Sequence, residues 1–120
     1  MAKNGTDDQQ ARGAPPGGAQ RLTALMISAL DNATRRETLR SLHRRGGAYS
    51  ASQLSEWIDT DPTNISYHLR ILFNVGAVSR AGERLVRAVP EKLFASEVAG
   101  HRQVVAILAD TEEDDEWLRK

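Results

Sequence analysis

The sequence contains no cysteine. This absence excludes disulfide bridges, zinc sites built on thiolates and catalytic cysteine nucleophiles. It also fits a reducing compartment, in which structural disulfides are rare. Aromatic residues make up only 5% of the chain, so we expect an aliphatic core built from leucine, valine, isoleucine and alanine. A chain of 120 residues buries a limited share of its surface, and we therefore expect a partner chain to complete that core.

Long apolar runs are absent as well. No stretch approaches the roughly 18 to 20 consecutive apolar residues that cross a bilayer, and the N-terminus lacks the basic-then-apolar order of a signal peptide. These absences predict a soluble protein in the cytoplasm with no membrane partner. The length allows one domain with a tail and leaves little room for a deep catalytic cleft.

The net charge of zero conceals an uneven distribution along the chain. Residues 1–32 are balanced, residues 33–88 carry nine arginines against five acidic side chains, and residues 89–120 carry four basic groups against eight acidic ones. Asymmetry of this kind favours contact between the basic segment and nucleic acid.

The first 18 residues are rich in glycine, proline and polar side chains, and we expect residues 1–18 to form a disordered arm. Apolar residues then recur at spacings of three and four from Ala19 to near Asp31, which predicts an amphipathic helix. A second helix, capped by Asn32 or Asp31, is expected over Ala33–Arg45, with its leucines inward, its arginines outward and the glycine pair 46–47 ending it.

Two further helices are predicted with a short polar turn between them. Ser50 and Gln53 have the spacing of a capping box, which starts a helix at Ala51 that runs to about Ile58. Asp61 is expected to cap the next helix, 62–75, in which Pro62 takes the first position because its missing N–H costs nothing there. Helix, turn and helix follow one another directly.

The helix 62–75 has two distinct faces when its residues are placed at 100° intervals. Ile65, Leu69, Leu72 and Phe73 fall on an apolar arc. The opposite arc consists of hydrogen-bonding side chains, namely Thr63, Ser66, Tyr67, Arg70 and Asn74.

Beyond this helix the pattern predicts a short β-hairpin with strands at 77–80 and 84–89 around a turn at 81–83, closed by Pro90. A last helix is expected from about Glu91 or Leu93 to Ala109. Residues 110–120 form an acidic tail, in which Trp117 and Leu118 could dock on a neighbour.

Three stretches carry a resemblance to a known family. They are LDNATRRETLRSL at residues 30–42, QLSEWIDTDPTNISYHLRIL at 53–72 and NVGAVSR at 74–80. In this order and spacing the chain resembles the ArsR-like winged-helix repressors. The resemblance covers about half of the chain. It implies a mainly α fold with a small β-hairpin, namely a winged helix-turn-helix domain over residues 19–109. Within this domain, the run ISYHLRIL belongs to the recognition helix.

The resemblance further implies a homodimer, paired through the first and last helices, that binds a pseudo-palindromic operator on double-stranded DNA. The sequence departs from the founding members where QLSEW replaces the cysteine-rich metal motif, which argues against metal sensing. The predicted wing is also short, which argues against contact with the minor groove. No motif identifies a small-molecule effector.

Side chains that can read base edges gather in the first half of helix 62–75. The major groove admits one helix and presents distinct donors and acceptors, which amide, hydroxyl, imidazole and guanidinium groups can match. The alternative is that these side chains only keep a surface helix soluble, and His68, which leans towards the apolar arc, is as well explained by packing. The candidate readers are Thr63, Asn64, Ser66, Tyr67, His68 and Arg70.

Arginines elsewhere in the basic segment are candidate phosphate contacts, which position a protein without encoding sequence. For any one of them a solvated surface position is an equally good explanation. Arg35, early in the second helix, and Arg84, at the expected wing tip, are the preferred candidates. The others are Arg36, Arg40, Arg44, Arg45, Arg80 and Arg87.

Metal binding and catalysis receive little support. Glu97 and His101 stand four apart on the expected last helix, but one such pair is better explained as a surface contact than as a zinc site. The chain has no glycine-rich phosphate loop and no G-x-S-x-G motif, and its three histidines fall on different predicted helices. We therefore expect no enzyme, no cofactor and no metal site. The leading interpretation is a dimeric, sequence-specific DNA-binding transcription regulator, a repressor, that reads the major groove with the helix 62–75. The alternative is a winged-helix module that binds protein and not DNA, with its acidic tail engaging a basic partner.

Overall fold

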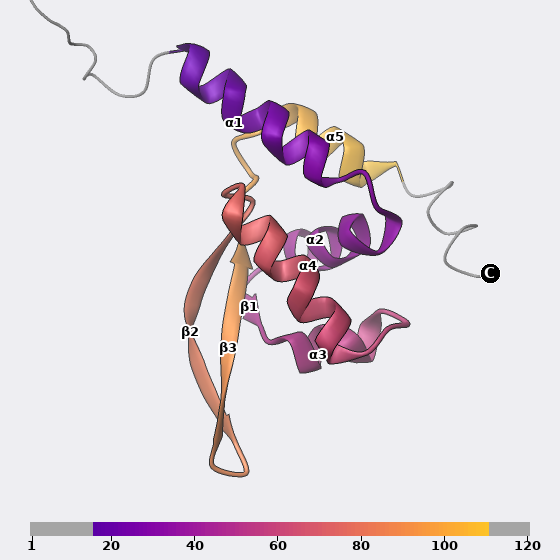
Figure 1. The fold of residues 1–120 in the computed structure, drawn as a ribbon, viewed down its shortest axis with the longest axis vertical. Coiled ribbons are helices and arrows are strands. Elements are labelled where there is room, and N and C mark those ends of the chain that lie inside the picture. The colour runs from indigo at the N-terminus through magenta and orange to yellow at the C-terminus, as the bar shows by residue number, and fades with distance from the viewer. Residues whose placement is uncertain (1–15, 111–120) are drawn as a thin grey trace, which may run out of the picture.

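The computed structural model describes residues 16–110, with side chains from Arg21 onward. The predicted arm, apart from its last three residues, and the acidic tail after Asp110 lie outside the described residues. Within these residues, five helices form one body, and a hairpin of the three-stranded sheet projects from its side (Figure 1). The elements are α1 (Pro16–Ala29), α2 (Ala33–Arg45), β1 (Ala48–Tyr49), α3 (Ala51–Trp57), α4 (Pro62–Asn74), β2 (Val78–Val86), β3 (Val89–Ser96) and α5 (Arg102–Ala109).

The helix starts predicted from capping residues are confirmed. Asn32 accepts the backbone N–H of Arg35 at the start of α2. Ser50 and Gln53 form both hydrogen bonds of a capping box at the start of α3. Asp61 caps α4 through the N–H of Asn64, and a proline occupies the first turn. These caps satisfy amide groups that would otherwise lack partners, which fixes where each helix begins.

The hairpin is longer than the sequence indicates, and the predicted turn at 81–83 is wrong. β2 continues through this segment to Val86, with one extra residue between Arg80 and Glu83 relative to β3, where Gly82 has a φ of 113°. The actual turn is formed by Arg87 and Ala88, whose φ values are 53° and 68°. Turns of this shape usually contain asparagine and glycine, so the pair Arg-Ala gave no recognisable signal.

The predicted last helix is wrong in its first half. Residues 89–96 form β3, which pairs antiparallel with both β1 and β2, and α5 begins only at Arg102. Pro90 therefore lies within a strand and does not close the hairpin. It is tolerated because β1 reaches only Phe94 and Ala95, so that at Pro90 one side of β3 is a free edge.

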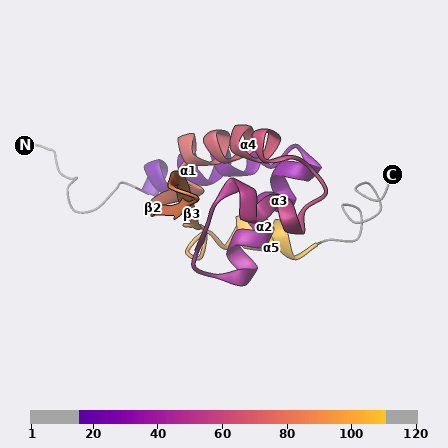
Figure 2. The same cartoon turned by 90° about the horizontal axis from the view of Figure 1, so that it is seen from below.

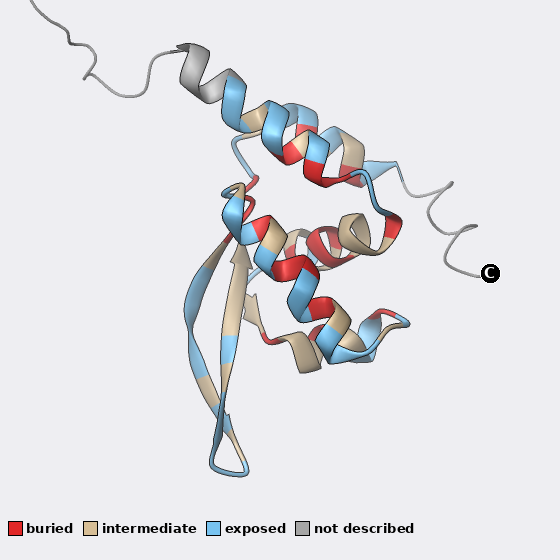
Figure 3. Cartoon of the chain, viewed as in Figure 1, coloured by how far each residue is buried: buried red, intermediate tan, exposed pale blue. Residues whose placement is uncertain are grey.

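The core lies between α2, α3, α4 and α5 and takes in the end of α1 through Met26 and Leu30, as the red segments of Figure 3 indicate. Seen along the hairpin in Figure 2, α4 occupies one face of the helical body and α5 the opposite face. α1 contacts both α4 and α5. The core is aliphatic, as predicted, and its fully buried side chains include Leu39, Leu42, Leu54, Ile65, Leu69, Leu72, Val98 and Val104. Within residues 16–110, no helix is both long and apolar enough to cross a bilayer.

Arg40 of α2 is buried, contrary to the prediction that it points outward. Its side chain is 1% exposed, Nε donates to the carbonyl of Leu108 at 2.6 Å, and Nη1 forms an ion pair with Glu37. Nη2 donates to the carbonyl of Asp110 at 3.3 Å. The guanidinium therefore donates hydrogen bonds to carbonyls at the C-terminal end of α5, which have no N–H partner within the helix.

We expect Arg40→Ala to lower the free energy of unfolding by about 3 kcal/mol, because the buried carbonyl of Leu108 loses its donor and Glu37 loses its cationic partner. Urea denaturation followed by circular dichroism measures the change. Arg44→Ala is the matched control, since Arg44 is exposed on the same helix, and it should change stability by less than about 0.5 kcal/mol. Equal stability of the two variants would contradict this account of Arg40.

Candidate nucleic-acid interface

The outward face of α4 presents polar side chains to solvent. Thr63, Ser66, Tyr67 and Arg70 are all exposed, and Tyr67 is 50% exposed. Because α4 begins at the Asp61 cap and buries its opposite face, these side chains point away from the core. Hydroxyl and guanidinium groups on an exposed helix are suited to hydrogen bonding with base edges.

Two residues on α4 differ from the sequence-based expectation. Phe73, placed on the apolar arc, is 44% exposed. Asn64, a candidate reader, is half-buried and donates from Nδ2 to Thr60 Oγ1 at 2.8 Å. In this structure its amide therefore stabilises the turn before α4.

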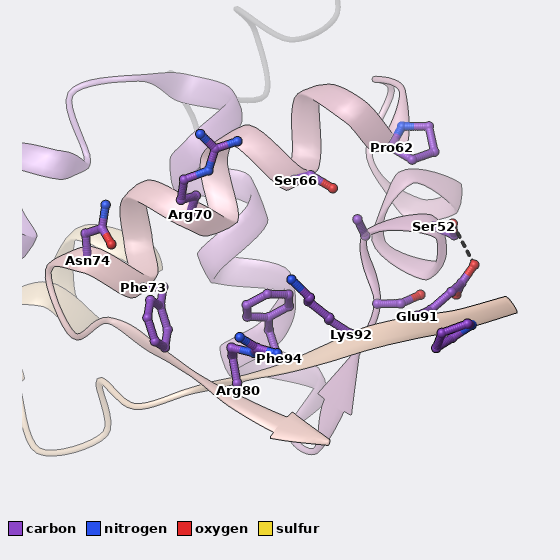
Figure 4. A pocket seen from close by; sticks show the side chains of 13 residues that line it. Ser52, Pro62, Ser66, Arg70, Phe73, Asn74, Arg80, Glu91, Lys92 and Phe94 are labelled. Atoms are coloured by element: carbon purple, nitrogen blue, oxygen red, sulfur yellow. Dashed lines mark hydrogen bonds between the residues drawn. The ribbon is translucent and has the colours of Figure 1, made fainter. Parts of the chain in front are cut away.

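An open groove of about 650 Å³ separates α4 from the hairpin, with the start of α3 at one end. Figure 4 shows Arg70 of α4, Arg80 of β2 and Lys92 of β3 around it, with Phe73 and Phe94 beside them. Three cationic side chains from three different elements thus border one groove. The sequence reasoning missed Lys92, because it assigned this residue to a helix.

Arg84 does not lie at the wing tip, and that prediction is wrong. It is half-buried within β2, pairs across the hairpin with Glu91, and its Nη2 lies 3.0 Å from Oε1 of that carboxylate. Ser52 Oγ donates to the other oxygen of Glu91 at 3.1 Å. Hydrogen bonds from Ser50, Arg84 and Ser52 lower the pKa of Glu91 and keep it ionised. The tip itself carries Arg87, which is exposed.

His68 lies on the buried side of α4, with 4% of its surface exposed, so in this structure it packs within the protein and is not placed to contact DNA. Arg35 Nε donates to His68 Nδ1 at 3.2 Å, and Arg35 Nη1 donates to the carbonyl of Ala29 at 2.7 Å. Arg35, preferred above as a phosphate contact, is thus half-buried and bound within the protein. Burial, and then the charge of Arg35, lower the pKa of His68.

Among the remaining arginines of residues 33–88, Arg36 is half-buried and the others are exposed. Arg36 Nη1 donates to the carbonyl of Leu30 at 2.7 Å, at the end of α1. Arg45 stacks on Trp57, with 3.6 Å between its guanidinium carbon and the ring centroid. Arg44, Arg45, Arg80 and Arg87 are exposed, and these four retain the position that a phosphate contact requires.

The pair Glu97 and His101 does not occupy one helix face, because both residues precede α5. Ser79 Oγ lies 2.6 Å from Glu97 Oε2, whereas His101 Nδ1 lies 3.0 Å from Thr23 Oγ1 of α1. Within residues 16–110, no group of three or more histidine or acidic side chains is placed to hold a metal ion.

The lowered pKa of His68 predicts a pH dependence of stability. The unfolded chain takes up a proton below about pH 6.5, whereas the folded protein takes it up only at lower pH, so acid favours unfolding between the two values. The free energy of unfolding should therefore fall as the pH drops below about 6.5.

Denaturation of the wild type and of His68→Asn between pH 7.5 and about pH 5 measures this effect. Asparagine removes the titration while keeping an acceptor near the position of Nδ1. The variant should lose less stability than the wild type over that range, whatever its stability at neutral pH. Parallel curves would show that His68 does not titrate as described.

Comparison with known proteins agrees with this geometry. Residues 32–80 match the model of the bacterial regulatory proteins of the arsR family. A search of curated proteins finds no match. Among solved structures, an ArsR-like transcriptional regulator from Rhodococcus sp. RHA1 is 26% identical, with a TM-score of 0.56 over 85% of this chain and 88% of that one.

Two other solved structures share the fold at lower identity. NolR from Sinorhizobium fredii is 19% identical, with a TM-score of 0.56 over 82% of this chain and 93% of its own. The homodimeric winged helix-turn-helix DNA-binding domain of Mb0332 from Mycobacterium bovis is also 19% identical, with a TM-score of 0.57 over 92% and 93% of the two chains. The winged helix-turn-helix prediction is thereby confirmed.

Proposed function

We propose that this DNA-binding transcription regulator reads the major groove with α4. The match of residues 32–80 to the arsR family of bacterial regulatory proteins supports the proposal. The observation that carries this proposal is the exposed polar face of α4, bordered by the cationic groove. Thr63, Ser66, Tyr67 and Arg70 read base edges, while Arg80, Lys92 and Arg87 contact phosphates along the hairpin. The same proposal includes repression as the regulatory effect and the cytoplasm as the location.

A homodimer is part of the proposal, with α1 and α5 forming its interface. These helices contact each other, and α1 exposes two leucines, Leu22 at 47% and Leu25 at 48%. Exposed leucines on one helix are suited to burial against a second copy. The Mb0332 domain is itself homodimeric. Two copies would bring two α4 helices to successive turns of the same duplex face.

The reading role of Arg70 is tested on duplexes selected from a random library by the wild-type protein. Arg70→Ala should weaken binding to the selected duplex by about 1 to 3 kcal/mol, because a guanidinium that pairs with a base is lost. Arg44→Ala removes the same charge from an exposed site outside α4 and should affect selected and random duplexes alike. Unchanged affinity of Arg70→Ala for the selected duplex would remove Arg70 from the readers.

Salt dependence tests DNA binding itself. Phosphate contacts release counterions, so affinity should fall steeply between about 50 mM and 200 mM salt. If no duplex binds even at low salt, the alternative of a protein-binding winged helix takes precedence. A reporter gene placed behind the selected sequence then distinguishes repression from activation.

The dimer interface is tested by Leu25→Glu, which places a carboxylate on the exposed apolar face of α1. The variant should elute as a monomer in size-exclusion chromatography with light scattering, because the buried charge would lack a partner. Leu85→Glu is the control, since Leu85 is 74% exposed in β2 close to the hairpin turn, and this end of the hairpin lies far from α1 in Figure 1. If Leu25→Glu keeps the mass of the wild type, α1 does not form the interface.

A further inference from the structure

Three elements meet at the side chain of Arg35. Its backbone N–H is bound by the capping Asn32 at 2.9 Å, so the residue projects from the fixed first turn of α2. One end of the guanidinium donates to the carbonyl of Ala29 at the end of α1, and Nε donates to His68 in the middle of α4. The hydrogen bonds therefore connect α1, α2 and α4 through one side chain.

The contact with His68 has a defined direction and protonation state. A guanidinium has only donors, so Nδ1 of His68 must be the unprotonated nitrogen that accepts. Burial beside Arg35 lowers the pKa of this imidazole, which keeps the accepting form at neutral pH. His68 lies on the buried side of α4, and its ring meets that of the neighbouring Tyr67 edge-on, with 5.3 Å between the centroids.

The apolar contacts of α4 do not determine its rotation in the same way. The residues that hold it to the core, Ile65, Leu69 and Leu72, are aliphatic and fully buried. Apolar burial is not directional, whereas a hydrogen bond depends steeply on angle and distance. A small rotation of α4 about its axis would retain most of the apolar burial but would break the bond between Arg35 and His68.

We infer that Arg35 is a positioning residue for DNA recognition, which sets the rotation of α4 relative to the end of α1 by holding His68. This inference rests on the proposed function of α4. It replaces the earlier interpretation of Arg35 as a phosphate contact. The exposed face of α4 then meets the bases in one orientation, because the hydrogen bond from Arg35 to His68 holds its buried face.

The two roles of Arg35 make different predictions for binding. As a positioning residue, Arg35→Ala should lower affinity for the selected duplex about tenfold and for random duplex less than about twofold, with the salt dependence unchanged. As a phosphate contact, it should weaken both duplexes equally and make the slope of log affinity against log salt shallower by about 1. Arg44→Ala shows what the loss of one exposed α2 charge does to both duplexes.

Two substitutions at His68 test the same link without touching Arg35. His68→Asn retains an acceptor near Nδ1 and should preserve the preference for the selected duplex, whereas His68→Leu fills the space without an acceptor and should reproduce Arg35→Ala. Circular dichroism verifies that each variant is folded. If Arg35→Ala does not fold, the pair of His68 variants decides, and equal preference in both overturns the inference.

The outcomes separate this inference from the proposal on which it rests. A wild-type protein that does not distinguish the selected duplex from random DNA removes the proposed reading by α4. A wild type that does distinguish them, together with an equal loss on both duplexes in Arg35→Ala, overturns the positioning role alone.

Discussion

Arginine side chains of α2 hold the ends of the first and last helices. Arg36 donates a hydrogen bond to a carbonyl at the end of α1, and Arg40 donates hydrogen bonds to carbonyls at the end of α5. Carbonyls at the end of a helix lack intrahelical partners, and a guanidinium supplies several donors in one plane. α2 therefore joins the terminal helices to the helix-turn-helix.

An arginine in this chain can therefore either face solvent, where phosphates could be contacted, or bind a carbonyl at a helix end, and the sequence does not distinguish these two roles. A run of arginines on one helix resembles a surface for phosphates, and the spacing alone cannot show which guanidinium finds a carbonyl on an element far along the chain. Leu108 lies 68 residues beyond Arg40. Such a pairing follows from tertiary packing, so the outward orientation expected for Arg40 was wrong, whereas Arg44 is exposed as expected.

Local signals were sufficient where structure depends on neighbouring residues. The caps at Asn32, Ser50 and Asp61 fix three helix starts within one turn, and each was predictable from side-chain chemistry. The segment 89–96 was not, because its apolar residues fit a helix as well as a strand, and pairing with both β1 and β2 decides between them. The polar face of α4 was predicted, but the groove beside it required the correct position of β3.

The two-residue turn at Arg87 and Ala88 limits how the hairpin can change in length. Side chains alternate between the two faces of a strand, so inserting a single residue beside this turn would exchange the faces of everything beyond it. Glu91 would then no longer face Arg84: an insertion on the β2 side would bring Lys92 to that position, and one on the β3 side would bring Pro90. Lengthening by two residues would retain both faces. Among related sequences with this wing, length differences near the turn should therefore occur in steps of two, unless a second bulge absorbs the odd residue as the one near Gly82 does.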